Sequence, residues 1–212
     1  MIHVRKATQK DIPLIIKGIL AIETNPKSLS DTYTNLFSTD ILTTKEYLNE
    51  FFLDEENFDT ELSLNTYHIV EVDGKPAGCC ALIFTNANYY QNKSELFPIH
   101  LTKDHLTAFV NNVSTLPETK NESENKYSIQ YVFVDDDFRN KGIAEYLLNH
   151  IISEMEGLSS DLYIDVLESS PHLVKYYAKF GFEEYITIVI DTPENKIYPS
   201  IRKNILRKKL NN

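Results

Sequence analysis

Cysteine is scarce in this chain: the 212 residues contain only Cys79 and Cys80, which are adjacent. Neighbours on a strand point to opposite faces of a sheet, so we do not expect a disulfide between them. A chain without a disulfide scaffold is compatible with a reducing compartment. No stretch is apolar over enough residues to span a bilayer, and no basic segment followed by an apolar core opens the chain. We therefore expect a cytoplasmic protein.

Basic residues are also in the minority, with 21 Lys and Arg against 31 Asp and Glu and a net charge of −10. Proteins that bind nucleic acid or anionic membranes contact phosphate groups through Lys and Arg. The charge balance therefore argues against both as partners. Hydrophobic residues make up 42% of the chain and charged residues 25%, an ordinary balance that provides for a sizeable core.

Apolar periodicity predicts one domain over residues 1–212 in the mixed α/β class. Strands are expected at residues 2–7, 67–72, 75–85, 127–134, 162–167 and 183–190. Helices are expected to be capped by Asp11, by Thr43 and by Ser169 or Ser170, and another follows Gly142. We expect a loop at residues 27–40, whereas residues 197–210 fit a strand and a helix equally well.

Glycine is sparse, and this excludes two common phosphate-binding loops at the turn formed by residues 139–144. Residues 139–144 read R-N-K-G-I-A, with one glycine, whereas a dinucleotide fingerprint needs three and a P-loop needs Gly-Lys-Ser/Thr. The turn nevertheless joins a strand pattern to a helix pattern, and the free N–H groups of a helix N-terminus bind anions. Because Gly142 lets a ligand approach the backbone closely, this turn is the candidate phosphate site.

The pattern Arg139-x-x-Gly142-x-Ala144 resembles motif A of the GCN5-related N-acetyltransferases, which wraps the pyrophosphate of acetyl-CoA. Two positions depart from the motif: Asp136 replaces the usual proline, and Ala144 replaces the commoner final glycine. The later segment from Asp165 to Phe182, with Y-x-x-x-G-F at its end, is similar to the same family. The resemblance implies the fold of that family, a single mixed and partly splayed β-sheet flanked by helices. In this fold the parallel strands 127–134 and 162–167 would separate to admit the cofactor.

The reaction implied by this resemblance is transfer of an acetyl group from acetyl-CoA to a primary amine by direct attack on the thioester. The acceptor would be a small-molecule or peptide amine, and a homodimer is possible. Tyr177 matches the general acid of the family, and Asp165 stands where some relatives place a base, with Glu168 and Glu71 as alternatives. The residues implied to bind the cofactor are Val132, Phe133, Val134, Arg139, Asn140, Lys141, Gly142, Ile143, Ala144 and Ser170.

No metal is expected, because the histidines show no metal-ligand spacing in the sequence. One function from a different class stays open, namely a catalytically degenerate protein that binds acetyl-CoA as a sensor or interaction module. Ser170, where the family often has a longer Asn, and Asp136 favour that alternative, whereas Tyr177 and Gly142 favour the enzyme.

An insertion at about residues 86–126 is longer than the turns around it, and such segments are usually functional or disordered. Asp104 is expected to cap a short helix, and residues 117–125 are expected to form a surface excursion. Four aromatic residues of the insertion are expected to line the acceptor pocket or a dimer contact: Tyr89, Tyr90, Phe97 and Phe109. Its acidic residues would favour a cationic acceptor: Glu95, Asp104, Glu118, Glu122 and Glu124.

Overall fold

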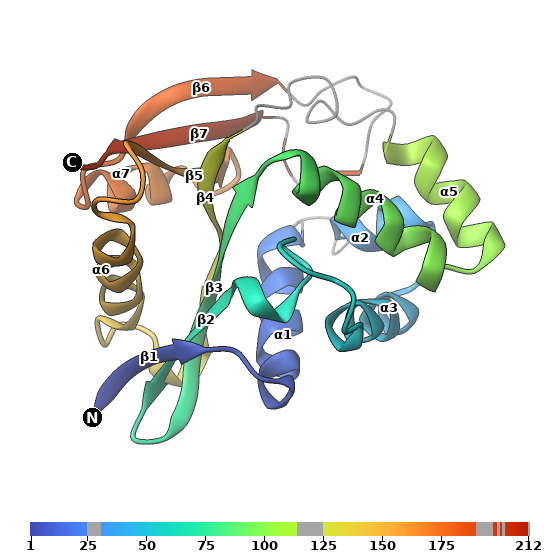
Figure 1. Ribbon diagram of the computed structural model, residues 1–212, viewed down its shortest axis with the longest axis horizontal. Helices are drawn as coiled ribbons and strands as arrows, with labels where there is room; N and C mark the ends of the chain where they lie inside the picture. The colour runs from blue at the N-terminus through green and yellow to red at the C-terminus, as the bar shows by residue number, and fades with distance from the viewer. Residues whose placement is uncertain (25–30, 114–124, 190–196, 199, 201, 212) are drawn as a thin grey trace.

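The computed structural model describes residues 1–24, 31–113, 125–189, 197–198, 200 and 202–211. A seven-stranded mixed sheet with the order β1-β2-β3-β4-β5-β7-β6 runs through these residues (Figure 1). The strands are β1 (Ile2–Lys6), β2 (Tyr67–Val72), β3 (Lys75–Thr85), β4 (Lys126–Val134), β5 (Asp161–Leu167), β6 (Glu183–Val189) and β7 (Arg202–Lys209). Neighbouring strands are antiparallel except β4 and β5, which are parallel. The predicted fold class, a mixed sheet flanked by helices, is confirmed.

Helices cover both faces of the sheet, and each face has its own hydrophobic core (Figure 1). One face carries α1 (Ile12–Glu23), α2 (Thr32–Phe37), α3 (Ile41–Leu53), α4 (Ala87–His100) and α5 (Lys103–Val113). The opposite face carries α6 (Ile143–Met155) and α7 (His172–Ala178). Short 3-10 turns occupy Gln9–Asp11, Leu64–Thr66 and Asp136–Phe138. No helix in the described part of the chain has the length and apolar character needed to cross a membrane.

Helix α1 illustrates how the sequence pattern produces the packing. Ile12, Ile15 and Ile19 recur at helical spacing, and all three are buried against the sheet. Gly18 permits the close approach to β4, because a Cβ at that position would lie 2.9 Å from the side chain of Phe133. A residue larger than glycine at position 18 would therefore push α1 away from β4.

Several expected boundaries were wrong. The expected loop at 27–40 contains α2, and α3 begins after Asp40 rather than after Thr43, since the Asp40 carboxylate accepts hydrogen bonds from the N–H groups of Leu42 and Thr43. Neither expected serine caps α7, because Pro171 takes the position before its first residue. The ambiguous C-terminal segment contains a strand, β7, which pairs with both β5 and β6.

The described part of the insertion, residues 86–113 and 125–126, contributes side chains to the core. It contains α4, which was not expected, and α5, which includes the predicted short helix. Its side chains Tyr89, Leu96 and Phe97 are buried in the core beneath α1, α2 and α3. Of the expected surface excursion at 117–125, all but the last residue lies outside the described residues.

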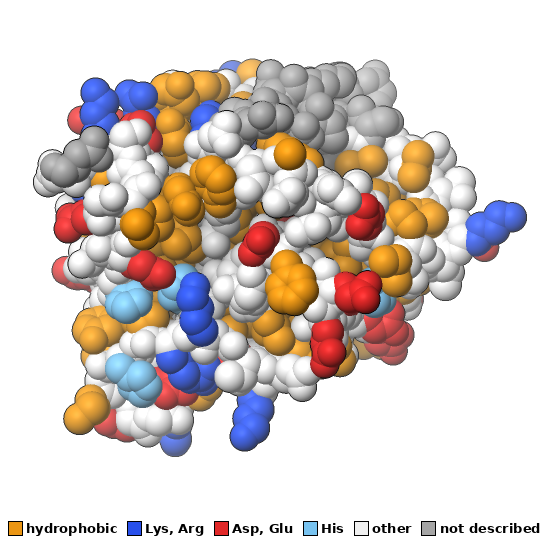
Figure 2. Space-filling view, viewed as in Figure 1, with side chains coloured by type: hydrophobic (Ala, Val, Ile, Leu, Met, Phe, Trp, Pro, Cys, Tyr) orange, Lys and Arg blue, Asp and Glu red, His pale blue; other side chains and the backbone are white. Residues whose placement is uncertain are grey.

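Side chains of both charges are spread over the face shown in Figure 2. Several acidic side chains gather over the region of α3, and several basic side chains and histidines lie near β1, while further basic side chains lie at the edges of the view. On this face the Lys and Arg side chains are dispersed among acidic and apolar ones.

Candidate active site

The turn between β4 and α6 presents a row of free backbone donors. Asn140 and Gly142 have positive φ angles of 61° and 73°, and Gly142 is the N-cap residue of α6. Within the described part of the chain, the backbone N–H groups of residues 140–145 have no hydrogen-bond partner, and the next one, of Tyr146, donates to the carbonyl of Gly142. A concave nest of N–H groups at a helix N-terminus is a ready anion site. The turn therefore has the donors that a phosphate group requires.

The space around this turn is open to a ligand. A Cβ added at Gly142 would meet no other atom within 4 Å. The side chain of Arg139 is 56% exposed, and its guanidinium forms an ion pair of 2.9 Å with Asp136. Asp135 is held in turn by Lys17 at 2.7 Å. Two of the three aspartates before the turn are thus paired with cations, which explains how they can adjoin an anion site.

The strands β4 and β5 separate beside this turn. Their pairing covers only Tyr127–Ile129 against Leu162–Ile164 in the described residues. At Tyr131 the backbone adopts a φ of 53°, and the register against β3 shifts at the same place, so β4 bulges there. Phe133 and Val134 still pair with β3 on their other edge. The edge of residues 132–134 that faces β5 is therefore free of ladder pairing.

A cavity of about 690 Å³ lies where the two strands separate. Its wall includes Gln130 and Tyr131 from β4, Asp165 from β5 and Lys203 from β7. Helices α1, α2, α4 and α5 supply about half of the wall residues, and these include five aromatic rings: Tyr33, Tyr89, Tyr90, Phe97 and Phe109. All four aromatic residues expected from the insertion are among these wall residues. We conclude that the insertion builds one side of the cavity.

The acidic residues expected to attract a cationic acceptor are not the ones that the cavity contains. Glu95 and Asp104 are exposed and do not line it. Glu118, Glu122 and Glu124 lie outside the described residues. The acidic side chains on the cavity wall are instead Glu23, Glu61 and Asp165.

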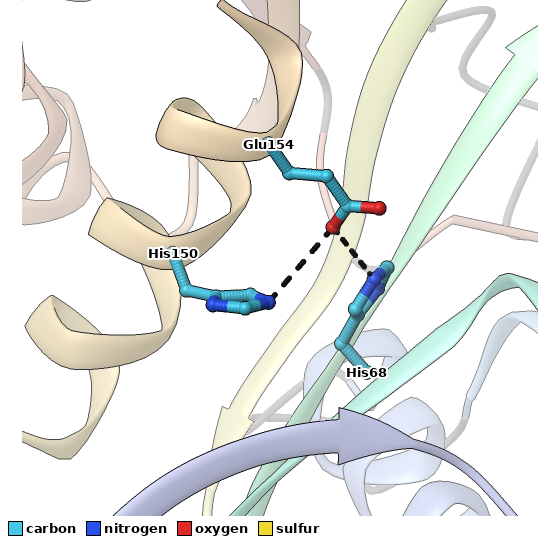
Figure 3. A group of neighbouring side chains, drawn as sticks. All are labelled: His68, His150 and Glu154. Carbon is cyan, nitrogen blue, oxygen red and sulfur yellow. Dashed lines mark ion pairs between the residues drawn. The ribbon is translucent and has the colours of Figure 1, made fainter.

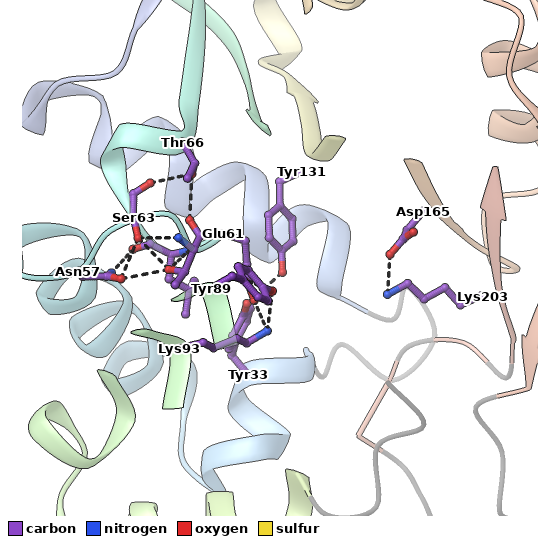
Figure 4. Close-up of polar contacts among 12 residues, drawn as sticks. Tyr33, Asn57, Glu61, Ser63, Thr66, Tyr89, Lys93, Tyr131, Asp165 and Lys203 are labelled. Carbon is purple, nitrogen blue, oxygen red and sulfur yellow. Dashed lines mark hydrogen bonds and ion pairs between the residues drawn. The ribbon is translucent and has the colours of Figure 1, made fainter. Parts of the chain in front are cut away.

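Glu61 is the most buried charged group on this wall, with 4% of the residue exposed. Its carboxylate pairs with the ammonium of Lys93 and accepts a hydrogen bond of 2.8 Å from the hydroxyl of Tyr89 (Figure 4). Burial raises the pKa of the Glu61 carboxyl, but Lys93 and the hydrogen-bond donors outweigh it, so the net pKa lies below its ordinary value. Glu61 is therefore an anion at neutral pH.

A second polar group on the wall joins two tyrosines from different elements. The hydroxyl of Tyr33, on α2, lies 2.9 Å from the hydroxyl of Tyr131, on the bulge of β4. Burial raises the pKa of both phenols well above the ordinary value, so both are neutral at pH 7. These hydroxyls can donate or accept hydrogen bonds at the point where β4 and β5 separate.

Asp165 and Lys203 form a separate pair on the other side of the cavity (Figure 4). Their side chains lie on β5 and β7, with 2.7 Å between the Asp165 carboxylate and the Lys203 ammonium. Lys126 lies nearby with its ammonium 4.9 Å from the centre of the Tyr163 ring, and burial lowers its pKa. Asp165, the candidate base, thus lines the cavity, and its catalytic role stays a prediction.

Tyr177, the candidate acid, lies on the opposite face of the sheet from the cavity-lining helices. Its side chain packs in the core under α6 and α7 against Tyr176 and Phe182. The hydroxyl has no hydrogen-bond partner among the described residues, yet the only fully buried unpaired side-chain atoms there are the ring nitrogens of His68. The Tyr177 hydroxyl therefore keeps some access to solvent. Burial raises its pKa, so the phenol is protonated at neutral pH.

Neither Tyr177 nor Ser170 is among the residues that form the wall of the cavity. The backbone N–H of Ser170 donates to Leu167 and its carbonyl accepts from Leu173, so the residue shapes the turn before α7. The paired residues Glu61 and Lys93 were missed in the sequence. No motif marks them, because they meet only when α4 packs beside the turn that precedes β2.

A model of the acetyltransferase (GNAT) family matches residues 29–182 of the chain. A search among proteins of curated function finds no match. Among solved structures, similarity extends to an acetyltransferase with 17% identity and a TM-score of 0.61, over 99% of this chain and 100% of that one. An N-acetyltransferase from Staphylococcus aureus Mu50 has 14% identity and a TM-score of 0.71, over 97% and 99%.

A third solved structure is an agmatine N-acetyltransferase mutant in its apo form. It shares 11% identity and a TM-score of 0.55, with 99% of both chains covered. At these identities the solved structures establish the common fold.

Proposed function

Since the chain belongs to the acetyltransferase (GNAT) family, we propose that it is an acetyl-CoA-dependent N-acetyltransferase whose acceptor is a small-molecule amine. The observation that carries this proposal is the row of free backbone donors at residues 140–145. The strand that leads into this row, β4, also contributes Tyr131 to the cavity wall. A cofactor anchored by its pyrophosphate at the turn can therefore extend along the free edge of β4 to the cavity.

In the proposed reaction, the nitrogen of the acceptor amine attacks the thioester carbonyl, and the carbon–sulfur bond breaks. The amine loses a proton, and the coenzyme thiolate gains one. Tyr177 is proposed to protonate the coenzyme thiolate, because its raised pKa keeps the phenol protonated at pH 7. Asp165 is proposed to accept the proton of the amine, directly or through a water molecule, since it is the carboxylate on β5 that faces the cavity.

The dimensions and chemistry of the cavity support a small molecule over a peptide as the acceptor. Its volume of about 690 Å³ falls in the range of about 300–1,000 Å³ that holds drug-sized ligands. Tyrosine and phenylalanine rings supply much of its wall, so the acceptor is expected to have an apolar or aromatic body. The polar groups Glu61, Tyr131 and Asp165 would orient its amine and any second polar group.

The test is to measure acetyl-CoA affinity by calorimetry and coenzyme A release across a panel of amines, from amino acids and polyamines to arylalkylamines. We expect micromolar-range binding of acetyl-CoA and faster release with at least one small amine. Binding without any acceptor-stimulated release would support the sensor alternative and overturn the enzyme. Failure of acetyl-CoA to bind would overturn both.

A further inference from the structure

Two histidines and a glutamate converge on the face of the sheet that carries α6, away from the cavity. His68 lies on β2, whereas His150 and Glu154 lie one helical turn apart on α6 (Figure 3). The Glu154 carboxylate is 3.0 Å from Nε2 of His68 and 3.9 Å from Nε2 of His150. The three ligand atoms all lie within 4.8 Å of one another.

His68 is the unusual member of this group. Only 2% of the residue is exposed, and neither ring nitrogen has a hydrogen-bond partner among the described residues. The Glu154 carboxylate lies within ion-pair distance of Nε2 without meeting the geometry of a hydrogen bond. Buried polar atoms in proteins normally have a hydrogen-bond partner, so a buried imidazole that lacks one beside a second histidine and a carboxylate indicates a missing ligand.

We propose that His68, His150 and Glu154 bind a divalent transition-metal ion, for which Zn²⁺ is the best fit, and that the ion links α6 to β2. Two imidazoles and one carboxylate are a common ligand set for Zn²⁺. With Zn–ligand bonds of about 2.0–2.1 Å, tetrahedral ligands lie about 3.3 Å apart, and the two distances to Glu154 bracket that value. Small side-chain rotations suffice to complete the geometry.

Exposure gives the ion a route to the site. The side chains of His150 and Glu154 are 44% and 39% exposed, so the ion can enter from solvent and keep a water molecule as its fourth ligand. The site also faces a cation, because Lys6 pairs with His68 across β1 and β2 and is exposed. Its ammonium repels a cation at this site, but its long side chain can turn away into water.

The expected effect of the ion is on the position and stability of α6. This helix begins at Gly142, so the proposed link would fix the same helix whose first turn presents the free donors. None of the three ligands lies in that turn or on the cavity wall. A test of the metal site is therefore independent of a test of the proposed acetyltransferase activity.

The test is calorimetric titration of Zn²⁺ into the full chain, without a polyhistidine tag and after chelator treatment, with melting temperatures measured in parallel. We expect one Zn²⁺ per chain, a higher melting temperature with zinc, and with Co²⁺ the visible absorption of a tetrahedral cobalt site. Mg²⁺, which prefers oxygen ligands, should produce none of these effects.

His150→Ala removes an exposed ligand without opening the core. We expect this variant to bind zinc about 100-fold more weakly, and we expect zinc to leave its melting temperature unchanged. The matched control is His3→Ala, which removes a histidine paired with a single carboxylate, Glu71, and should leave zinc binding unchanged. Lys6→Gln should tighten binding several-fold by removing the opposing charge. Equal zinc affinity in wild type and His150→Ala, or equal losses in His150→Ala and His3→Ala, would overturn the proposal.

Discussion

The turn proposed to bind the pyrophosphate and the cavity proposed to hold the acceptor are built in opposite ways. The turn consists of consecutive residues, 139–145, and its donors are backbone groups whose positions follow from two residues with positive φ. The cavity consists of side chains from helices α1, α2, α4 and α5 and strands β3 to β7. A site made of neighbouring backbone groups needs only a local conformation, whereas the cavity needs the whole fold.

The two regions also differ in how they are tied to the core. Gly142 has open space around it, and Arg139 is largely exposed. On the cavity wall, Tyr33, Tyr89 and Phe97 belong to the hydrophobic core beneath the helices. Substitutions in the turn should therefore change binding more than stability, while substitutions on the cavity wall should change both stability and turnover. Replacing residues 88–124 by a short linker would remove core side chains and unfold the protein.

The largest effect is expected from Gly142→Glu. The new carboxylate would occupy the open space above the donors and repel the pyrophosphate, and the positive φ disfavours any side chain there. Loss of two hydrogen bonds to a charged group corresponds to about 4 kcal/mol, or on the order of 1,000-fold in the dissociation constant of acetyl-CoA by calorimetry.

Gly157→Glu is the matched control for this variant. Gly157 also has a positive φ and open space around it, but it lies beyond the C-terminal end of α6. It should carry the same backbone strain without affecting affinity. If both variants bind acetyl-CoA as the wild type does, the pyrophosphate site lies elsewhere.

The second-largest effect is expected on the rate of acetyl transfer. Tyr177→Phe retains the packing against Phe182 and removes only the hydroxyl. We expect kcat to fall about 10- to 1,000-fold because the leaving thiolate loses its acid, with acetyl-CoA affinity nearly unchanged. Tyr176→Phe, at the adjacent residue, is the control and should keep its rate. A Tyr177→Phe enzyme at full rate would remove Tyr177 from the mechanism.

On the cavity wall, Glu61→Gln should reduce stability. It leaves the Lys93 ammonium without its partner, a change that costs roughly 3–5 kcal/mol in fully buried pairs. Since the Lys93 side chain is 38% exposed, we expect about 2–3 kcal/mol in urea unfolding, together with slower acceptor turnover. Glu95→Gln, on the exposed side of α4, should change neither quantity. Equal stability of the two variants would show that the ion pair between Glu61 and Lys93 does not stabilise the protein.

The smallest effect is a pH dependence of the difference in stability between wild type and Glu61→Gln. Because the pKa of Glu61 is lowered in the folded protein, its contribution is fully present above the unfolded pKa of about 4.3 and is lost as the pH falls through the folded value. The stability gap between wild type and Glu61→Gln should thus be widest at pH 7 and shrink below about pH 4.3. Urea unfolding at pH 7, 5, 4 and 3 measures it, and a gap that stays constant would contradict the assigned charge.

Sequence reasoning was most successful where signals were local and repeated. The helix after Asp11, the neighbouring strands β2 and β3, and the strand-turn-helix at Gly142 all lie where expected. It failed where two local signals competed or where none existed. Asp40 replaced Thr43 as the cap of α3 because its carboxylate accepts from two N–H groups. Helix α4 has almost no amphipathic pattern and contains Pro98, so nothing in the sequence marked it.

The sequence by itself determined the family resemblance, the fold class and the strand-turn-helix at Gly142, because these depend on periodicity and on the conformation of adjacent residues. Only the tertiary structure decided which side chains meet. Glu61 with Lys93, Tyr33 with Tyr131, and His68 with His150 and Glu154 come from segments far apart in the chain. Their contacts depend on how helices pack on a twisted sheet, and a difference of one residue in register or one helical turn would separate them.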